Sequence, residues 1–358
     1  MADHRSGVGR LDHVDGLRAV AILWVAIYHY AYFWTSAGKG TPLMPYDAAL
    51  AWVPLADVGF LGVYLFFIVS GFVIAMSLER SASILRFWLN RLIRLWPTLL
   101  ICGAITFAAT SLLGPPDLVR SWTEYLISMT FFPPSRVSQI TGIAGLDWLD
   151  GAYWSLWTEV RFYIIAGFLY FAVRARFLLV WTMFAVLCSA VHVWGLLHGG
   201  LFDALSRALF AEHQPYFTAG IALAALRVDA GERWPRGVLA LAIAQALVYP
   251  ALAEGGLTLS LLIGLFIVFA LAIPVMLSRG PVPVLSSRAM VSAGVASYAY
   301  YLLHQNTGIA LLTALAGSSV AGNILIMLAT QMALLLVSIL LTGRIEVPLR
   351  RWLRARTA

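Results

Sequence analysis

Hydrophobic residues in this chain run together in long stretches that are separated by short polar segments. A helix needs about 20 consecutive apolar residues to cross the roughly 30 Å hydrocarbon core of a bilayer. Ten stretches reach a suitable length. We therefore predict ten membrane-spanning helices, at about residues 17–35, 58–78, 92–113, 153–173, 177–195, 203–226, 236–253, 256–278, 289–315 and 320–343.

The composition excludes a water-soluble protein. Of the 358 residues, 61% are apolar and 11% are charged, whereas soluble domains average about 45–50% and about 25%. A soluble fold of this composition would have a core too large for its surface. The net charge of +7 is therefore not read as a nucleic-acid-binding surface. The prediction is an all-α polytopic membrane protein, one transmembrane domain over residues 1–358, with the lipid bilayer as its partner.

The basic residues orient the predicted helices. With the N-terminus inside, 19 of the 24 Lys and Arg residues fall on the cytoplasmic side, and Lys39, Arg120, Arg136 and Arg207 fall on the other. Arg161 lies within a span. The positive-inside rule thus predicts that both termini are cytoplasmic, in agreement with an even number of spans. The first apolar run has no small-residue cleavage site, so we expect no cleavable signal peptide, and no fused soluble domain at either end.

The longest predicted loop, residues 114–152, lies on the outer side and contains Pro115, Pro116, Pro133, Pro134, Asp147 and Asp150. Loops of this length between spans are more often functional than not. The two cysteines, Cys102 and Cys188, lie in apolar spans. We expect neither a disulfide framework nor a metal site from them.

Two ionisable residues share a face of the first span. Arg18 and His29 are eleven residues apart, which returns to within about 20° of the same direction on a helix and separates them by about 16 Å. A cation at the cytoplasmic mouth and an imidazole near mid-membrane suit a ligand with a phosphate head and a long thin arm. The alternative is a snorkelling anchor and a hydrogen-bonded core histidine.

A second basic cluster, Arg86, Arg91 and Arg94, precedes the third span on the same side. Arg91 and Arg94 are neighbours on one helical face, and guanidinium forks suit phosphate oxygens. The alternative is ordinary positive-inside charge.

Further polar residues lie where lipid or packed helices are expected, and charges there indicate function. Glu159 and Arg161, in the fourth span, point to different sides of the helix and are not expected to pair. Glu159 could orient His29, or form an ion pair within the bundle. His304, near mid-depth in the ninth span, could bind an acceptor sugar, hydrogen-bond to the first site, or hold helices together. His192, Trp194 and His198 are predicted interface anchors.

Four segments resemble motifs of the bacterial acyltransferase-3 family of integral-membrane acyltransferases. The opening Leu11–Ala19 with His29 fits its pattern of arginine, ten residues and histidine. Gly62–Phe72 looks like its second-span signature, Arg91–Arg94 like its Arg-x-x-Arg motif, and Tyr153–Glu159 like its fourth-span motif. The four occur in the family's order on a ten-span layout.

This resemblance implies transfer of an acyl group, usually acetyl, from cytoplasmic acyl-CoA to hydroxyls of glycans, lipid-linked sugars or secreted small molecules, in the bacterial cytoplasmic membrane. It implies that Arg18, Arg91 and Arg94 hold the CoA phosphates and that His29 is catalytic. We expect no metal. Glu159 is the second predicted catalytic residue. The side chains expected to contact substrate are Asp15, Trp154, Tyr301 and His304.

Two other functions fit the same pattern. The acceptor could be a macrolide-like small molecule instead of a glycan. The protein could also be a transporter or flippase for a polyprenyl-linked sugar, although we find no inverted repeat and no paired Gly/Pro-interrupted spans.

Overall fold

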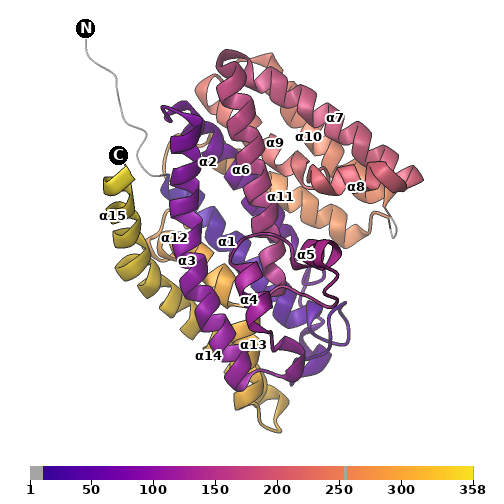
Figure 1. Cartoon of the computed structure of the whole chain (residues 1–358), viewed down its shortest axis with the longest axis vertical. Helices are drawn as coiled ribbons and strands as arrows, with labels where there is room; N and C mark the ends of the chain where they lie inside the picture. The colour runs from indigo at the N-terminus through magenta and orange to yellow at the C-terminus, as the bar shows by residue number, and fades with distance from the viewer. Residues whose placement is uncertain (1–10, 254–255, 358) are drawn as a thin grey trace.

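A computed structural model describes residues 11–253 and 256–357, and these residues form helices and connecting turns without a β-strand (Figure 1). Seven helical segments among them are long and apolar enough to cross a membrane. The predicted all-α membrane architecture is confirmed. The count of ten spans and the placement of the termini stay predictions, and Arg5 and Arg10, which entered the charge count, lie outside the described residues.

The main helices follow the apolar stretches. They are α1 (Asp12–Tyr28), α2 (Leu61–Glu79), α3 (Ile84–Leu113), α6 (Trp154–Val173), α7 (Phe177–His198), α8 (Gly200–Ala208), α9 (Gln214–Val228), α10 (Arg233–Leu252), α11 (Leu259–Leu277), α12 (Arg288–Leu303), α13 (Asn306–Leu315), α14 (Val320–Leu341) and α15 (Val347–Thr357). The predicted outer loop adds α4 (Trp122–Ser128) and α5 (Pro134–Thr141).

Two of the predicted spans are not continuous helices. Residues 203–226 divide into α8 and α9 at a turn where Phe210 has a positive φ of 46°. Residues 289–315 divide into α12 and α13 at Gln305, whose ψ of −84° is not helical. Hydropathy alone does not reveal such breaks, because both halves of each stretch are apolar.

Close approach of backbones brings the central helices together. A Cβ at Gly294 of α12 would lie 1.7 Å from the carbonyl oxygen of Asp15 in α1. A Cβ at Gly71 of α2 would lie 2.2 Å from the Phe217 oxygen in α9. In a bilayer the hydrophobic effect does not drive helices together, so helix association depends on close van der Waals packing. Small residues such as glycine allow that close packing. Helices α1, α2, α9 and α12 therefore form the centre of the bundle.

Helix α3 separates the outer loop from the C-terminal helix. α15 packs against α3 (Figure 1), and Arg354 meets Arg86 and Asn90 around one hollow near the start of α3. Further along α3, the Trp96 indole donates to the Met129 carbonyl at 3.0 Å, and the loop helix α4 packs beyond it. The loop and α15 thus contact successive parts of one long helix.

Candidate active site

One cavity of about 390 Å³ lies between α1, α2, α3, α6 and α12. We call it the arginine cavity. Its polar lining consists of Asp15, Arg18, Ser70, Arg80, Arg94, Ser155, Glu159, Tyr163, Ser297, Tyr298 and Tyr301. Its volume is in the range of small-molecule sites. The predicted residues Asp15, Arg18, Arg94, Glu159 and Tyr301 are therefore brought to one cavity from four helices.

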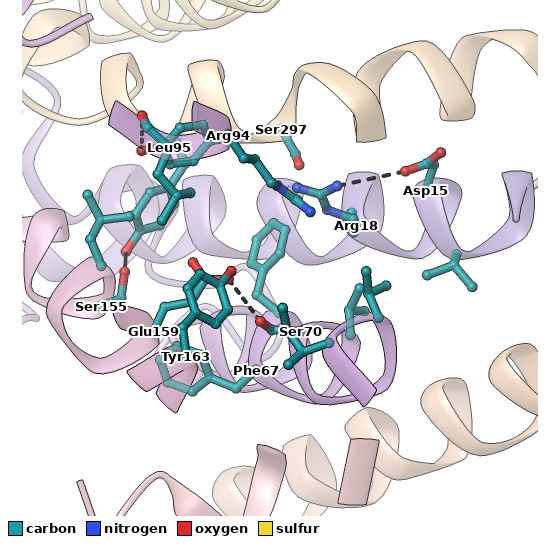
Figure 2. Close-up of a pocket in the computed structure, with 18 of the residues that line it drawn as sticks. Asp15, Arg18, Phe67, Ser70, Arg94, Leu95, Ser155, Glu159, Tyr163 and Ser297 are labelled. Carbon is teal, nitrogen blue, oxygen red and sulfur yellow. Dashed lines mark hydrogen bonds and ion pairs between the residues drawn. The ribbon is translucent and has the colours of Figure 1, made fainter. Parts of the chain in front are cut away.

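Two guanidinium groups face each other in this cavity. Figure 2 shows the ends of Arg18 and Arg94 pointing toward one another. Arg18 lies 3.7 Å from the Asp15 carboxylate, which is on the preceding turn of the same helix. Two cations at such close quarters repel each other, so an anion bound between them would be stabilised by both.

Glu159 lies on the opposite wall of the arginine cavity (Figure 2). Its Oε1 accepts hydrogen bonds from the Ser70 hydroxyl at 2.9 Å and from the Tyr163 hydroxyl. The structure does not show the pairing of Glu159 with His29 that was one of the two roles considered, because the carboxylate contacts Ser70 and Tyr163 and the imidazole contacts His304. The prediction that Glu159 and Arg161 diverge is confirmed, since Arg161 lines a different cavity.

Arg91 does not line the arginine cavity. Its Nη2 donates to the Ser77 hydroxyl at 3.2 Å, and its guanidinium lies 5.8 Å from the centre of the Phe87 ring. The Nε and Nη1 atoms are buried without a hydrogen-bond partner in the part of the chain that the structure describes. Arg91 thus retains donors for a ligand but lies beside the cavity and not in it.

The catalytic candidate His29 contacts a second histidine. Its Nδ1 lies 2.9 Å from Nε2 of His304, and the Nδ1 of His304 lies 2.8 Å from the Tyr301 carbonyl oxygen. A carbonyl oxygen can only accept, so His304 carries its proton on Nδ1. In the neutral ring, its Nε2 then accepts the proton of His29 Nδ1–H. This order leaves His29 Nε2 with a free lone pair, the form that a general base or nucleophile requires.

His304 is held by its backbone as well as by its ring. The Tyr30 hydroxyl donates to the His304 carbonyl at 2.6 Å, and the Gln331 amide contacts the same oxygen at 3.4 Å. The ring is fully buried. Both ring nitrogens have partners in this structure, one of them His29. Of the roles considered for His304, the structure therefore shows the hydrogen bond to the first site, and contact with an acceptor stays a prediction.

The helix break beside His304 is capped by the end of the outer loop. The buried Asp150 carboxylate accepts from the backbone N–H of Asn306, the first residue of α13, at 2.8 Å and from that of Ala152 at 2.9 Å. A carboxylate at a helix N-terminus satisfies a backbone donor that lacks an intrahelical partner. Burial nevertheless raises the pKa of Asp150 to about 7, although both backbone donors oppose this.

His29 begins a π-helical turn, His29–Phe33, which continues α1. Such widened turns often occur at functional sites. The residue keeps 9% exposure and lines neither of the two cavities described in this section. Tyr301, which lines the arginine cavity, has its ring centre 5.6 Å from that of His304, and its hydroxyl donates to the Ala152 carbonyl at 2.7 Å. The histidine pair therefore adjoins the arginine cavity through Tyr301, while His29 itself does not line that cavity.

A second cavity of about 830 Å³ lies between α2, α6, α7, α9 and the outer loop. We call it the aromatic cavity. Its rings belong to Phe60, Tyr64, Trp148, Trp154, Trp157, His192, Phe210, His213, Tyr216 and Tyr249, and its charged groups to Lys39, Arg136, Arg161, Asp203, Arg207 and Glu212. Three of the four basic residues predicted on the outer side line this cavity. Of the predicted substrate residues, Trp154 lies here and not in the arginine cavity.

Several site residues were not predicted. Ser70 and Tyr163 lie in the quoted second-span motif and next to the fourth-span motif, but nothing in the local pattern shows that they meet Glu159. His192 was predicted as an interface anchor, whereas its buried ring bonds to Ser206 at 2.7 Å within the aromatic cavity. His213 follows an acidic residue in an otherwise apolar region, a signal comparable to that of His29.

Among the described residues, no group of three or more His, Cys, Asp or Glu could hold a metal ion.

Comparison with known proteins places these features in a family. A model described as an acyltransferase domain, that of the acyltransferase-3 family, matches residues 11–343. The chain belongs to this acyltransferase-3 family. The match spans α1 to the end of α14 and includes both cavities and the histidine pair.

Two named relatives are bacterial proteins. The chain is 29% identical over 167 residues to O-acetyltransferase OatA of Staphylococcus aureus, covering 43% of this chain and 24% of OatA. It is 32% identical over 173 residues to acyltransferase MdmB of Streptomyces mycarofaciens, covering 47% of this chain and 41% of MdmB. The matched parts are less than half of either relative. No solved structure matches the chain.

Proposed function

We propose that this acyltransferase-3 family member is a membrane O-acyltransferase. In this proposal it transfers an acyl group, with acetyl as the first to test, from cytoplasmic acyl-CoA to a hydroxyl group on the outer side of the bacterial cytoplasmic membrane. The observation that carries the proposal is the His29–His304 hydrogen bond, which leaves His29 Nε2 free to act as a base or nucleophile.

The arginine cavity supports the donor half of the proposal. Acyl-CoA combines phosphate groups with a long thin arm that ends in the thioester. Arg18 and Arg94 face each other without an intervening carboxylate and would bind phosphate oxygens through charge-assisted hydrogen bonds. Arg91, beside the cavity, would supply a further contact through its unpartnered Nε and Nη1. Apolar residues line the rest of the cavity toward Tyr301 and suit the arm.

His29 would perform the chemistry once the thioester reaches it from the arginine cavity. In direct transfer, the acceptor oxygen attacks the thioester carbonyl while His29 Nε2 takes the hydroxyl proton. The C–S bond breaks, and the CoA thiolate receives a proton to leave as the thiol. In the two-step route, Nε2 attacks the thioester, CoA leaves, and the acceptor hydroxyl then displaces the imidazole from the acyl carbon. His304 would hold His29 in the required tautomer in both routes.

The acceptor belongs to one of two classes. A glycan or lipid-linked sugar is the first, and a macrolide-like small molecule is the second. The aromatic cavity supports an acceptor with ring-shaped apolar faces and polar edges, because it combines many aromatic rings with charges of both signs.

Glu159, in the arginine cavity, would balance the charge of the arginines and would not act on His29.

Release of free CoA thiol from acetyl-CoA by detergent-purified protein tests this function. A thiol-reactive dye follows the reaction with and without a crude cell-envelope extract as the source of acceptor. We expect thiol release that depends on the protein and increases with the extract. Folded, monodisperse protein that releases no thiol from acetyl-CoA, propionyl-CoA or succinyl-CoA would contradict the proposal and favour the transporter.

A further inference from the structure

The aromatic cavity contains a histidine that the chemistry above does not use. His213 lies in the connection between α8 and α9 and directly precedes α9. Its side chain is half-buried and lines the cavity. This position is on the opposite side of α2 and α6 from the arginine cavity.

Three aromatic rings surround the His213 imidazole. The ring centres of Trp154, Tyr64 and Phe67 lie 5.0, 5.4 and 5.5 Å from its own. Within residues 11–253 and 256–357, its ring nitrogens make no hydrogen bond. A neutral imidazole has one donor and one acceptor, so His213 has both to offer to a molecule bound in the cavity. The rings thus fix the orientation of His213 while its polar atoms remain available to a ligand.

The same rings form the wall between the two cavities. Phe67 lines the arginine cavity, Trp154 lines the aromatic cavity, and their ring centres are 6.2 Å apart. The next residue along α6, Ser155, lines the arginine cavity again. A molecule bound at His213 would therefore be separated from the donor side by the thickness of a few side chains.

We propose that His213 and Trp154 form the acceptor subsite and that the His213 imidazole hydrogen-bonds a hydroxyl of a sugar ring. This inference rests on the proposed function, and it assigns the acceptor-side contact to named residues. A sugar presents C–H groups on its faces and hydroxyls at its edges, which matches indole rings beside an imidazole with free nitrogens. Charged partners for neighbouring hydroxyls are close by, because Arg161 and Glu212 line the same cavity. His213 is a binding residue in this scheme, and His29 remains the catalytic one.

The test compares His213→Ala, His213→Gln and His198→Ala in a bacterial host that lacks the chromosomal copy. His198 is the matched control, because it is exposed at the end of α7 and does not line the cavity. The readout is alkali-labile acetate in the cell envelope and in the medium. We expect His213→Ala to lower the amount of alkali-labile acetate at least about tenfold, because one hydrogen bond to the substrate is lost. Glutamine, which can hydrogen-bond, should restore part of it, and His198→Ala should match the wild type.

A second readout separates acceptor binding from a structural role. Purified His213→Ala should bind acetyl-CoA as tightly as the wild type and should still hydrolyse it slowly without acceptor. Normal ester levels in the cells, or loss of acetyl-CoA binding, would overturn the inference. If the wild type neither binds acetyl-CoA nor releases thiol, the proposed function itself fails.

Accessibility provides a test that does not depend on the acceptor. The His213→Cys variant should react with a membrane-impermeant maleimide added to intact cells, whereas the buried Cys102 and Cys188 of the wild type should not. Protection of the introduced thiol in intact cells, with labelling only after the cytoplasmic side is opened, would contradict an acceptor site that faces outward.

Discussion

His29 and His304 share a hydrogen bond of 2.9 Å although 275 residues separate them along the chain. The Tyr301 carbonyl fixes the proton of His304, and His304 in turn fixes that of His29. In serine hydrolases a carboxylate has this positioning role for the catalytic histidine. A neutral histidine can do the same without placing a negative charge inside the buried helix bundle, where charges are costly.

The hydrogen-bonded chain from the Tyr301 carbonyl through His304 to His29, called the relay below, predicts the effect of changing His304. His304→Leu removes the acceptor for His29 Nδ1–H, so the tautomer of His29 is no longer fixed. We expect kcat for acyl transfer to fall at least about 100-fold, while the KM for acetyl-CoA stays within about twofold. His304→Gln, whose carbonyl can accept, should recover part of the rate. Wild-type kcat in His304→Leu would show that the relay has no role.

The facing arginines predict a phosphate-dependent loss of donor binding. Arg94→Ala should weaken acetyl-CoA binding about ten- to 100-fold, because hydrogen bonds to charged groups contribute about 1.5–3 kcal/mol. Isothermal titration calorimetry measures this directly. Acetyl-pantetheine, which lacks the phosphates, should bind both proteins equally, and Arg136→Ala, in the aromatic cavity, should bind acetyl-CoA normally. Equal weakening for both ligands would indicate a folding defect in place of a lost phosphate contact.

The Glu159→Gln variant distinguishes the two roles considered for Glu159, which are balancing the charge of the arginines and acting on His29. Glu159→Gln keeps a hydrogen-bond acceptor for Ser70 but removes the negative charge beside the arginines. If Glu159 only balances that charge, acetyl-CoA should bind a few-fold more tightly, since less competing charge remains near Arg18 and Arg94. If it acted on His29, kcat would fall with unchanged affinity. Calorimetry and steady-state kinetics on the same preparation separate these results.

Asp150 predicts a pH-dependent stability. Its pKa is about 7 in the folded protein and 3.8 in the reference state, so folding favours the protonated form. The stabilising contribution is complete below about pH 4 and is lost as the pH rises toward 7, by roughly 1 kcal/mol per unit. The thermal midpoint should therefore fall between pH 5 and 7 and fall less in Asp150→Asn. Parallel pH profiles of the two proteins would contradict this assignment.

The sequence predicted those features that depend on local pattern. Hydropathy gave the apolar helices, and charge spacing identified Arg18, Arg94 and Glu159, which line one cavity. Helical periodicity correctly separated Glu159 from Arg161. These properties need only the rise and rotation of a helix.

Contacts between distant segments could not be predicted in this way. The partner of His29 depends on how α1 and α12 pack, and Glu159 was assigned to it only because both were buried candidates. The break at Gln305 depends on Asp150, which lies 156 residues from Asn306 in sequence. His213 is conspicuous only once Trp154 and Phe67 are beside it. Packing between helices, and not the properties of any single helix, determines these three features.

The most direct test of the account is single-turnover acyl transfer by His29→Ala beside the wild type. Both proteins are purified in detergent, saturated with radiolabelled acetyl-CoA and mixed with cell-envelope extract. We expect His29→Ala to bind acetyl-CoA normally and to elute as folded protein, while its transfer rate falls at least about 1,000-fold. Transfer at the wild-type rate in His29→Ala would contradict the central claim that the free Nε2 of this histidine performs the chemistry.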